Sequence, residues 1–219
     1  MGTGRICFTF DDGNLSTFTE VFPLLRQAGM KGHIAVVTDY VGREDKYSWD
    51  QVAEMAAAGW EVMSHSRTHD FKAVDKEKMR SEVVGSREIL QERGFPARIF
   101  NMPGGPWSGE SRFAPGSDFE ALVRRTYDAF LPDRGIHPFT ESVDRYSIGH
   151  ICCECYGVRE YERPLPEILS SLDEAARTGT FCQLLWHDVR GDYLDKFRRV
   201  LARVVPLVRE GRLENVTLS

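Results

Sequence analysis

Two groups of acidic and histidine residues in this 219-residue chain could do chemistry together. Asp11 and Asp12 are adjacent and precede Gly13, while His65 and His69 are separated by three residues. A His-x-x-x-His spacing lets two imidazoles converge on one cation, and one aspartate of the pair can supply a third ligand. Catalytic zinc usually takes three such protein ligands and keeps one position for water. The other aspartate would then lie where a general base belongs.

A third feature is His187, which directly follows the apolar run Leu184–Trp186. Each feature also has a simpler explanation. Asp-Asp-Gly is a common turn or helix-start signal, a single pair of histidines four positions apart can arise by chance, and a histidine after an apolar strand is often structural. The positions of the three features along the predicted elements distinguish these explanations.

Hydrophobic periodicity predicts about eight strands in alternation with six or seven helices. The predicted strands are Arg5–Phe10, His33–Thr38, Trp60–Ser64, Arg98–Phe100, Tyr127–Leu131, Arg145–Cys152, Thr180–Trp186 and Asn215–Leu218. The predicted helices are Asn14–Gln27, Trp49–Ala58, Asp75–Arg93, one from a Ser117 cap to about Arg125, Glu167–Arg177 and Tyr193–Glu210.

Alternating strands and helices predict a parallel sheet, and eight such units favour a closed barrel. The chain is shorter than the roughly 250 residues of a regular eight-unit barrel, so we expect a distorted or incomplete α/β barrel, with an open doubly wound sheet as the alternative. No glycine-rich phosphate loop follows the first strand. We expect one domain over residues 1–219. All three features lie at carboxyl ends of strands, which a barrel brings together, and this joint placement favours a metal hydrolase.

Thr9–Gly13 followed by Ser64–His69 resembles the first two motifs of the polysaccharide deacetylases, the NodB-homology family of carbohydrate esterases. Leu184–His187 resembles the last motif of that family, and the resemblance extends from Ile6 to about Glu210. The resemblance implies an α/β fold, a distorted (β/α)7-8 barrel.

The resemblance also implies a role for each matching residue. Asp12, His65 and His69 would bind a divalent metal, usually zinc, with cobalt or nickel as substitutes. Asp11 would be the general base and His187 the general acid. The implied reaction is hydrolysis of an N-acetyl group, less often an O-acetyl group, from a sugar.

The third family motif, Arg-Pro-Pro-aromatic-Gly, departs from the pattern here. Asn101 replaces the arginine that holds the catalytic aspartate, and Gly104 replaces the aromatic residue. Gly104 can still offer its backbone N–H to an oxyanion, and Asn101 is a further candidate for substrate contact. Loss of the arginine predicts a raised pKa for Asp11 unless another arginine takes its place. The candidates are Arg67, Arg98 and Arg190.

The fourth motif, which usually ends in Asp-Trp and orients the acid histidine, has no clear counterpart. Three aspartates could be the partner of His187, namely Asp128, Asp133 and Asp144. Trp107, after the Gly104–Pro106 loop, and Trp186 are candidates for contact with a sugar ring, although tryptophan more often serves in packing.

The composition limits the possible binding partners of the protein and indicates its cellular compartment. The net charge of −5 provides no basic surface for nucleic acid or an anionic membrane. No apolar run approaches the roughly 18 residues of a membrane helix. Residues 1–5 lead directly into a strand without a secretory signal, and the five cysteines are odd in number, so we expect a reducing, cytoplasmic location. His150, Cys152, Cys153 and Cys155 could form a second metal cluster, but small buried residues on a strand are favoured.

The leading hypothesis is a metal-dependent hydrolase that removes an N-acetyl or related acyl group from an amino sugar or a small N-acylated metabolite. One alternative is an amidase or imidase that acts on a small non-sugar metabolite. Another is a catalytically weakened barrel that binds carbohydrate. The expected partner is a small molecule or a carbohydrate, and the sequence leaves the oligomeric state open.

Overall fold

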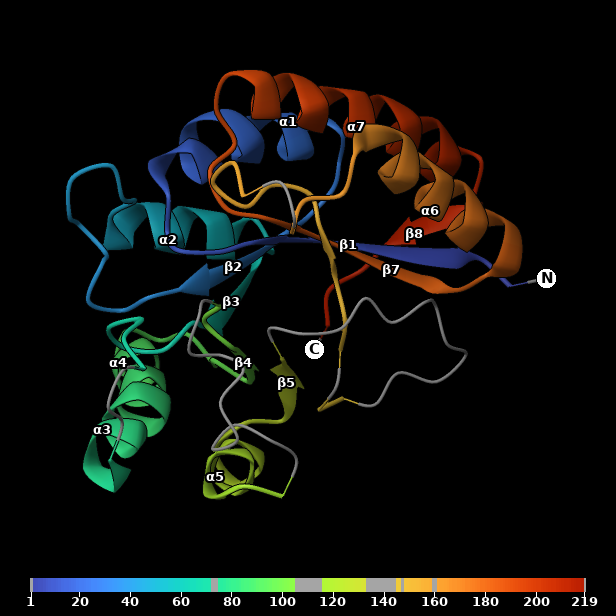
Figure 1. Ribbon diagram of the computed structural model, residues 1–219. Helices are drawn as coiled ribbons and strands as arrows, with labels where there is room; N and C mark the ends of the chain where they lie inside the picture. The colour runs from blue at the N-terminus through green and yellow to red at the C-terminus, as the bar shows by residue number, and fades with distance from the viewer. Residues whose placement is uncertain are drawn as a thin grey trace.

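The computed structural model describes residues 2–71, 75–104, 116–132, 145–146, 148–158 and 161–218. Within them, strands and helices alternate along the chain (Figure 1). The strands are β1 Gly4–Phe10, β2 His33–Val36, β3 Glu61–Ser64, β4 Ile99–Asn101, β5 Ala129–Leu131, β6 Ile151–Cys152, β7 Phe181–Trp186 and β8 Leu213–Asn215. The helices are α1 Phe22–Gln27, α2 Trp49–Ala57, α3 Lys76–Arg80, α4 Ser86–Glu92, α5 Asp118–Thr126, α6 Leu165–Thr178 and α7 Asp192–Arg209. Two π-helical turns, η1 Thr17–Val21 and η2 Ser81–Gly85, precede α1 and α4.

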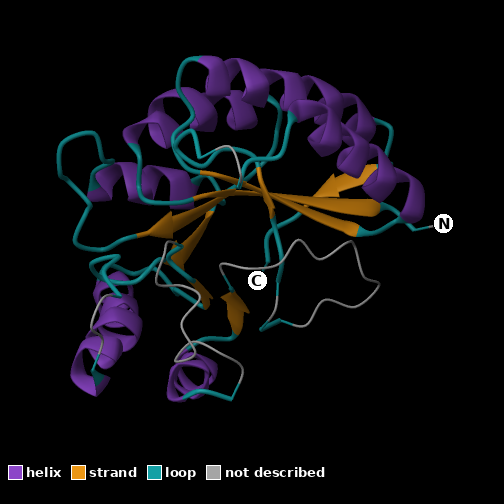
Figure 2. Ribbon diagram, viewed as in Figure 1, coloured by secondary structure: helices purple, strands orange, loops and turns teal. Residues whose placement is uncertain are grey.

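The strands form one curled sheet in which every pair is parallel. Their order is β5-β4-β3-β2-β1-β7-β6, and β8 also pairs with β1. The helices lie on the outer side of this sheet (Figure 2). On the free edge of β5, Phe130 N–H donates to the carbonyl of Arg145 at 2.7 Å, so Arg145 lies alongside β5. The expected distorted barrel is confirmed, and the open doubly wound alternative is not.

The core divides between the two faces of the sheet, because successive side chains of a strand point to opposite sides. On the outer face, Phe8 and Phe10 pack edge-on against Phe197 of α7, and each buried phenylalanine contributes roughly 2 kcal/mol. The inner face carries a smaller apolar cluster: Ala35, Met63, Ile99, Ala129, Leu131 and Ile148. Polar residues that come directly after the carboxyl end of a strand therefore lie at the mouth of the barrel.

The predicted helix starts at Ser48 and Ser117 are confirmed by hydrogen bonds from backbone N–H groups to the two hydroxyls. Two strand predictions need correction. Of the predicted strand Arg145–Cys152, only Ile151–Cys152 pairs with β7. The last strand is Leu213–Asn215 rather than Asn215–Leu218, because Leu213 pairs with Gly4 and its side chain occupies the space that a larger residue at Gly4 would need.

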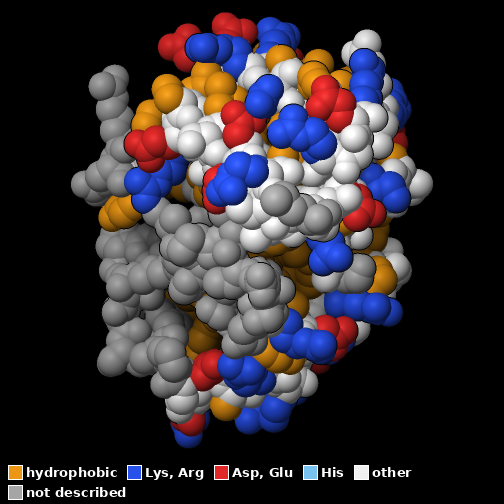
Figure 3. Space-filling view, turned by 90° about the vertical axis from the view of Figure 1, so that its right-hand side faces the viewer, with side chains coloured by type: hydrophobic (Ala, Val, Ile, Leu, Met, Phe, Trp, Pro, Cys, Tyr) orange, Lys and Arg blue, Asp and Glu red, His pale blue; other side chains and the backbone are white. Residues whose placement is uncertain are grey.

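The surface agrees with the composition. On the face shown in Figure 3, Asp and Glu side chains of the described residues are interspersed among Lys and Arg side chains. Among the described residues, no helix is both long enough and apolar enough to cross a membrane.

Candidate active site

Three strand ends bring the candidate catalytic residues together, as the sequence predicted. Asp11 and Asp12 follow β1, His65 follows β3, and His187 follows β7. Oδ1 of Asp12 lies 3.3 Å from Nε2 of His65 and 3.2 Å from Nε2 of His69. Oδ2 of Asp11 lies 3.8 Å from the same nitrogen of His65. The two aspartates and the His-x-x-x-His pair therefore form one cluster at the mouth of the barrel.

The backbone at this cluster adopts positive φ angles, which residues other than glycine rarely adopt. Asp12, Ser66 and His69 have φ angles of 68°, 66° and 61°. Each such residue costs roughly 1–2 kcal/mol, and strain of this kind concentrates at functional sites. A hydrogen bond from His69 N–H to Ser66 Oγ, 3.0 Å long, fixes the turn between the two histidines. The chain therefore bends at both ligand-bearing loops in order to aim these side chains inward.

The donor atoms fit a divalent cation. Nδ1 of His65 lies 2.9 Å from the carbonyl oxygen of Asn101, which can only accept, so this nitrogen carries a proton. In the neutral ring, Nε2 is then left with its lone pair toward Asp12. Oδ1 of Asp12 is buried and finds no hydrogen-bond donor among the described residues. One aspartate and two histidines are a ligand set that zinc takes, so Asp12, His65 and His69 could hold such an ion.

The charge state of Asp12 suits this role. Burial raises the pKa of Asp12, but hydrogen bonds from His65 and His69 when their Nε2 atoms carry protons, with the charges of His65 and His187, outweigh burial and bring this pKa well below its usual value. A bound cation would take the place of these protons beside Oδ1. The carboxylate is therefore ionised at neutral pH and can bind a cation.

Asn101 fills the place of the arginine that the third family motif carries. Its Nδ2 donates a 2.7 Å hydrogen bond to Oδ1 of Asp11. Burial, together with the charge of Asp12, raises the pKa of Asp11, while His65, His187 and Asn101 act in the opposite direction. The predicted raised pKa is confirmed, and burial is its largest cause. The amide of Asn101 is thus bound to the candidate general base, which leaves its predicted role in substrate contact a prediction.

The arginines considered as substitutes have other partners. Nε of Arg67 lies 3.4 Å from Oδ1 of Asp39, and Nη2 of Arg190 lies 2.8 Å from Oδ2 of Asp188. The structure gives no contact between Arg98 and Asp11, and the side chain that binds Asp11 is neutral. The general-base candidate is therefore oriented by an amide rather than by a cation.

Among the described residues, Glu154 is the acidic residue that contacts His187. Nδ1 of His187 lies 2.6 Å from the backbone oxygen of Glu154 and 3.6 Å from its carboxylate. The same carboxylate accepts the backbone N–H groups of His187 and Asp188 at 2.7 and 2.6 Å. Asp128 instead begins the segment of β5, and Asp133 and Asp144 lie outside the described residues.

These contacts set the protonation of His187. Burial lowers its pKa, but the charges of Asp11, Asp12 and Glu154 outweigh burial and raise the pKa to about 9. His187 is therefore protonated at neutral pH, as a general acid must be.

Tyr156 is a site residue that the sequence analysis missed. Its hydroxyl donates a 2.5 Å hydrogen bond to Oδ2 of Asp12 and accepts one from Asn14 at 2.9 Å. Its ring lies 5.1 Å from that of His187, centroid to centroid. Oδ2 of Asp12 is thus occupied, which leaves Oδ1 for the cation. The only sequence signal is the turn-forming Gly157 that follows.

The remaining predicted residues are placed as follows. Gly104 is half-buried, three residues after the end of β4. Trp107 lies outside the described residues. The structure does not bring Trp186 to the site, because the side chain is fully buried and packs edge-on against Phe197 with 5.3 Å between ring centroids. In the structure Trp186 therefore belongs to the core and offers no open face to a sugar.

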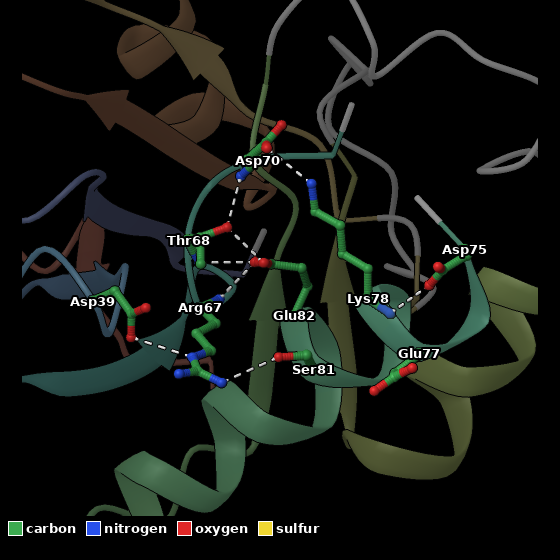
Figure 4. A pocket seen from close by; sticks show the side chains of 9 residues that line it. All are labelled: Asp39, Arg67, Thr68, Asp70, Asp75, Glu77, Lys78, Ser81 and Glu82. Carbon is green, nitrogen blue, oxygen red and sulfur yellow. Dashed lines mark hydrogen bonds and ion pairs between the residues drawn. The ribbon is translucent and has the colours of Figure 1, made fainter. Parts of the chain in front are cut away.

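Glu82, on η2, holds the loop that joins the two histidines, as Figure 4 shows. Its carboxylate is buried and accepts the N–H groups of Arg67 and Thr68 at 3.0 and 2.8 Å and the hydroxyl of Thr68 at 2.5 Å. Arg67 in turn extends to Asp39 and donates to Ser81. Nothing in the sequence pattern indicated this role, because Glu82 lies within a charged stretch that suggests an exposed helix.

Glu82→Gln is expected to weaken cation binding by roughly 10- to 100-fold, the usual cost of losing an outer support of a metal ligand. The amide of glutamine has one acceptor atom where the carboxylate has two, so the loop between His65 and His69 loses part of its support. A cation titration checks this result. Glu88→Gln, an exposed position on α4, is the matched control and should bind as tightly as the wild type.

The fold is thus a distorted barrel of parallel strands, and the site is a cluster of histidines and aspartates at the carboxyl ends of these strands. The polysaccharide deacetylase family model matches residues 1–114. The chain belongs to the polysaccharide deacetylase family, whose members are hydrolases of the NodB-like carbohydrate esterase type.

Relatives and solved structures agree with this assignment. The chain is 27% identical over 135 residues to YxkH of Bacillus subtilis (strain 168), named as a polysaccharide deacetylase. The match covers 60% of this chain and 48% of YxkH, so it spans about half the length of that relative.

Among solved structures, a family 4 carbohydrate esterase from Streptomyces lividans in complex with acetate superimposes with a TM-score of 0.67. It is 17% identical, and the match covers 100% of this chain and 95% of the esterase. A family 4 acetyl xylan esterase from Clostridium thermocellum with a cobalt ion gives a TM-score of 0.61 at 18% identity, over 98% of this chain and 88% of that one. At these identities the likeness establishes the shared fold.

Proposed function

We propose that this chain is a metal-dependent deacetylase that hydrolyses the N-acetyl group, or a related acyl group, of an amino sugar or a small N-acylated metabolite. The observation that carries the proposal is that the two adjacent aspartates have different contacts. Asp12 directs a buried, donor-free oxygen toward two histidine nitrogens, while Asp11 is held separately by Asn101. One carboxylate can thus bind a cation, and the other is free to move a proton.

The residues around the cluster divide the reaction between them. Asp12, His65 and His69 would hold a divalent cation, which would supply polarisation of an acyl carbonyl and a lower pKa for water. Asp11 accepts the proton of the attacking water at its carboxylate, which Asn101 keeps in one orientation. His187 donates its proton to the nitrogen of the leaving amine, and the Gly104 N–H would stabilise the developing oxyanion.

The comparisons support the choice of reaction and cation. The Streptomyces lividans relative is named as an esterase in complex with acetate, and the Clostridium thermocellum relative is named with a cobalt ion. We propose zinc as the native cation, with cobalt or nickel as substitutes. The five cysteines are unpaired thiols, which supports a reducing, cytoplasmic location for a single catalytic domain.

Product analysis tests this proposal. The protein is loaded with one equivalent of zinc, cobalt or nickel and incubated with N-acetylated sugars and with small N-acyl compounds, and the acid released is identified. Acetate from an N-acetylated sugar is the expected product. A larger acid from a non-sugar compound would assign an amidase instead. Sugar binding without any acid release, with the cation present, would indicate a carbohydrate-binding barrel.

The dependence of turnover on pH is expected to be bell-shaped. Asp11 acts in its ionised form, so activity is lost as the pH falls through its raised pKa. His187 acts in its protonated form, so activity is lost as the pH rises through its pKa. Glu154→Gln removes a negative charge that favours protonated His187, so the alkaline limb should move to lower pH.

Pre-steady-state rates measured across the pH range check this shift. Glu167→Gln, an exposed position on α6, is the control and should keep the wild-type profile. An alkaline limb that stays in place in Glu154→Gln would contradict the pairing of Glu154 with His187.

A further inference from the structure

A second group of metal-ligating side chains lies beside His187. Cys152 ends β6, and Cys155 lies in the loop that follows. One ligand atom from each of Cys152, Cys155 and His187 lies within 4.8 Å of the other two. All three residues are partly exposed, so a small ion can reach them.

The neighbouring cysteine behaves differently. Cys153 is fully buried in the main core, and its Sγ lies 3.5 Å from the carbonyl oxygen of Ile151. Of the predicted small buried residues on a strand, Cys153 is buried but follows the end of β6, and Cys152 lies on β6 but is partly exposed. Cys152 and Cys155, in a Cys-x-x-Cys spacing, turn toward His187 instead.

The donor set is soft and differs in kind from that of the Asp12 site. Two thiolates and one imidazole suit thiophilic cations such as Zn²⁺, Co²⁺ and Cd²⁺. With a zinc–sulfur distance of about 2.3 Å, two sulfurs on a tetrahedral ion lie about 3.8 Å apart. The three donors therefore need to approach one another by roughly 1 Å at most, which lies within the reach of side-chain rotation.

A cation that binds this group displaces the protons of both sulfurs and the proton on Nε2 of His187, because Nδ1 of that ring faces the backbone oxygen of Glu154. Binding therefore releases these protons to the solvent.

We propose that Cys152, Cys155 and His187 form a second metal site, separate from the Asp12 site, that binds one thiophilic divalent cation. A cation in this site takes His187 as a ligand and so withdraws it from proton donation. Excess zinc therefore inhibits turnover. This inhibition rests on the proposed function, whereas the binding does not.

Titration of the metal-free protein with Cd²⁺, in the presence of a phosphine reductant that does not bind the ion, tests the site. Thiolate-to-metal charge-transfer absorption reports on it alone, since the Asp12 site contains no sulfur. The wild type should show a band that saturates with one bound ion. The double variant His65→Ala/His69→Ala should keep this band. Cys155→Ser and Cys152→Ala should lose it, with affinity reduced by at least about 100-fold.

Cys153→Ala is the matched control, since it changes the cysteine between these two and should keep the band. Absence of the band in the reduced wild type would overturn the proposal, and so would a full band in both Cys155→Ser and Cys152→Ala. A Cys152–Cys155 disulfide in air, without a cation band in the reduced protein, would also overturn it by assigning a redox pair.

Activity provides a separate readout. Relative to its own rate with one equivalent of zinc, the wild type should lose most of its turnover in excess zinc, and Cys155→Ser should need about 100-fold more zinc for the same loss. If the band behaves as expected but no acyl compound is hydrolysed, the second site stands and the proposed function fails. If turnover is present and excess zinc inhibits both proteins equally, the inhibitory role of this site fails.

Discussion

Asp11→Asn is expected to reduce turnover by about a thousandfold while the protein keeps its cation, the loss typical of removing a general base. Asparagine has the shape of aspartate and can still accept the hydrogen bond from Asn101, so the geometry of the site should persist. It cannot accept a proton from water. Measurement of turnover and of bound metal on the same sample separates the two effects.

Asp12→Asn is the matched comparison, because it makes the same chemical change one residue further along the chain. This variant should lose the cation, since the buried Oδ1 that faces His65 and His69 then loses its charge. Equal loss of metal in both variants would contradict the division of roles between Asp11 and Asp12. Unimpaired turnover in Asp11→Asn would remove the general base from the mechanism.

His187→Gln is expected to lower turnover on amide substrates by about a hundredfold or more, because the leaving amine then departs without a proton. The alkaline limb of the pH profile should disappear, since the imidazole that loses its proton there has been removed. An aryl acetate, whose leaving group departs without protonation, should be hydrolysed almost as fast as by the wild type. Comparison of the two substrates on one preparation checks the assignment.

A hundredfold loss on both substrates would instead indicate that His187 supports the structure of the site. The metal bound at the Asp12 site should stay at the wild-type level in this variant, because His187 is not a ligand of that site.

The sequence could predict the fold and the cluster of acidic and histidine residues for one physical reason. Parallel strands place their carboxyl ends on one edge, so residues that directly follow strands meet wherever the strands are recognised. Asp11, Asp12, His65 and His187 all follow apolar runs that are clear in the sequence. The prediction that these side chains lie together depends on the order of strands and helices. It holds even when the predicted ends of the strands are wrong by a few residues.

The supporting residues could not be predicted in this way. Tyr156 contacts Asp12 across 144 positions of the sequence, and Glu154 contacts His187 across 33. Both lie in a loop after a strand of two residues, where periodicity carries no signal. Glu82 supports the histidine loop from a helical turn whose neighbours are charged. Such contacts follow from the tertiary path of the loops, which local patterns do not encode.

The most direct test of the account is the metal content of the purified protein by elemental analysis, before and after reconstitution, with the Asp12 site present or removed. With Cys152 and Cys155 blocked, we expect one equivalent of zinc, cobalt or nickel in the wild type and none in His65→Ala/His69→Ala. Absence of metal even after reconstitution, or the same metal content in the double histidine variant under conditions where Cys152 and Cys155 are blocked, would contradict a cation held by Asp12, His65 and His69.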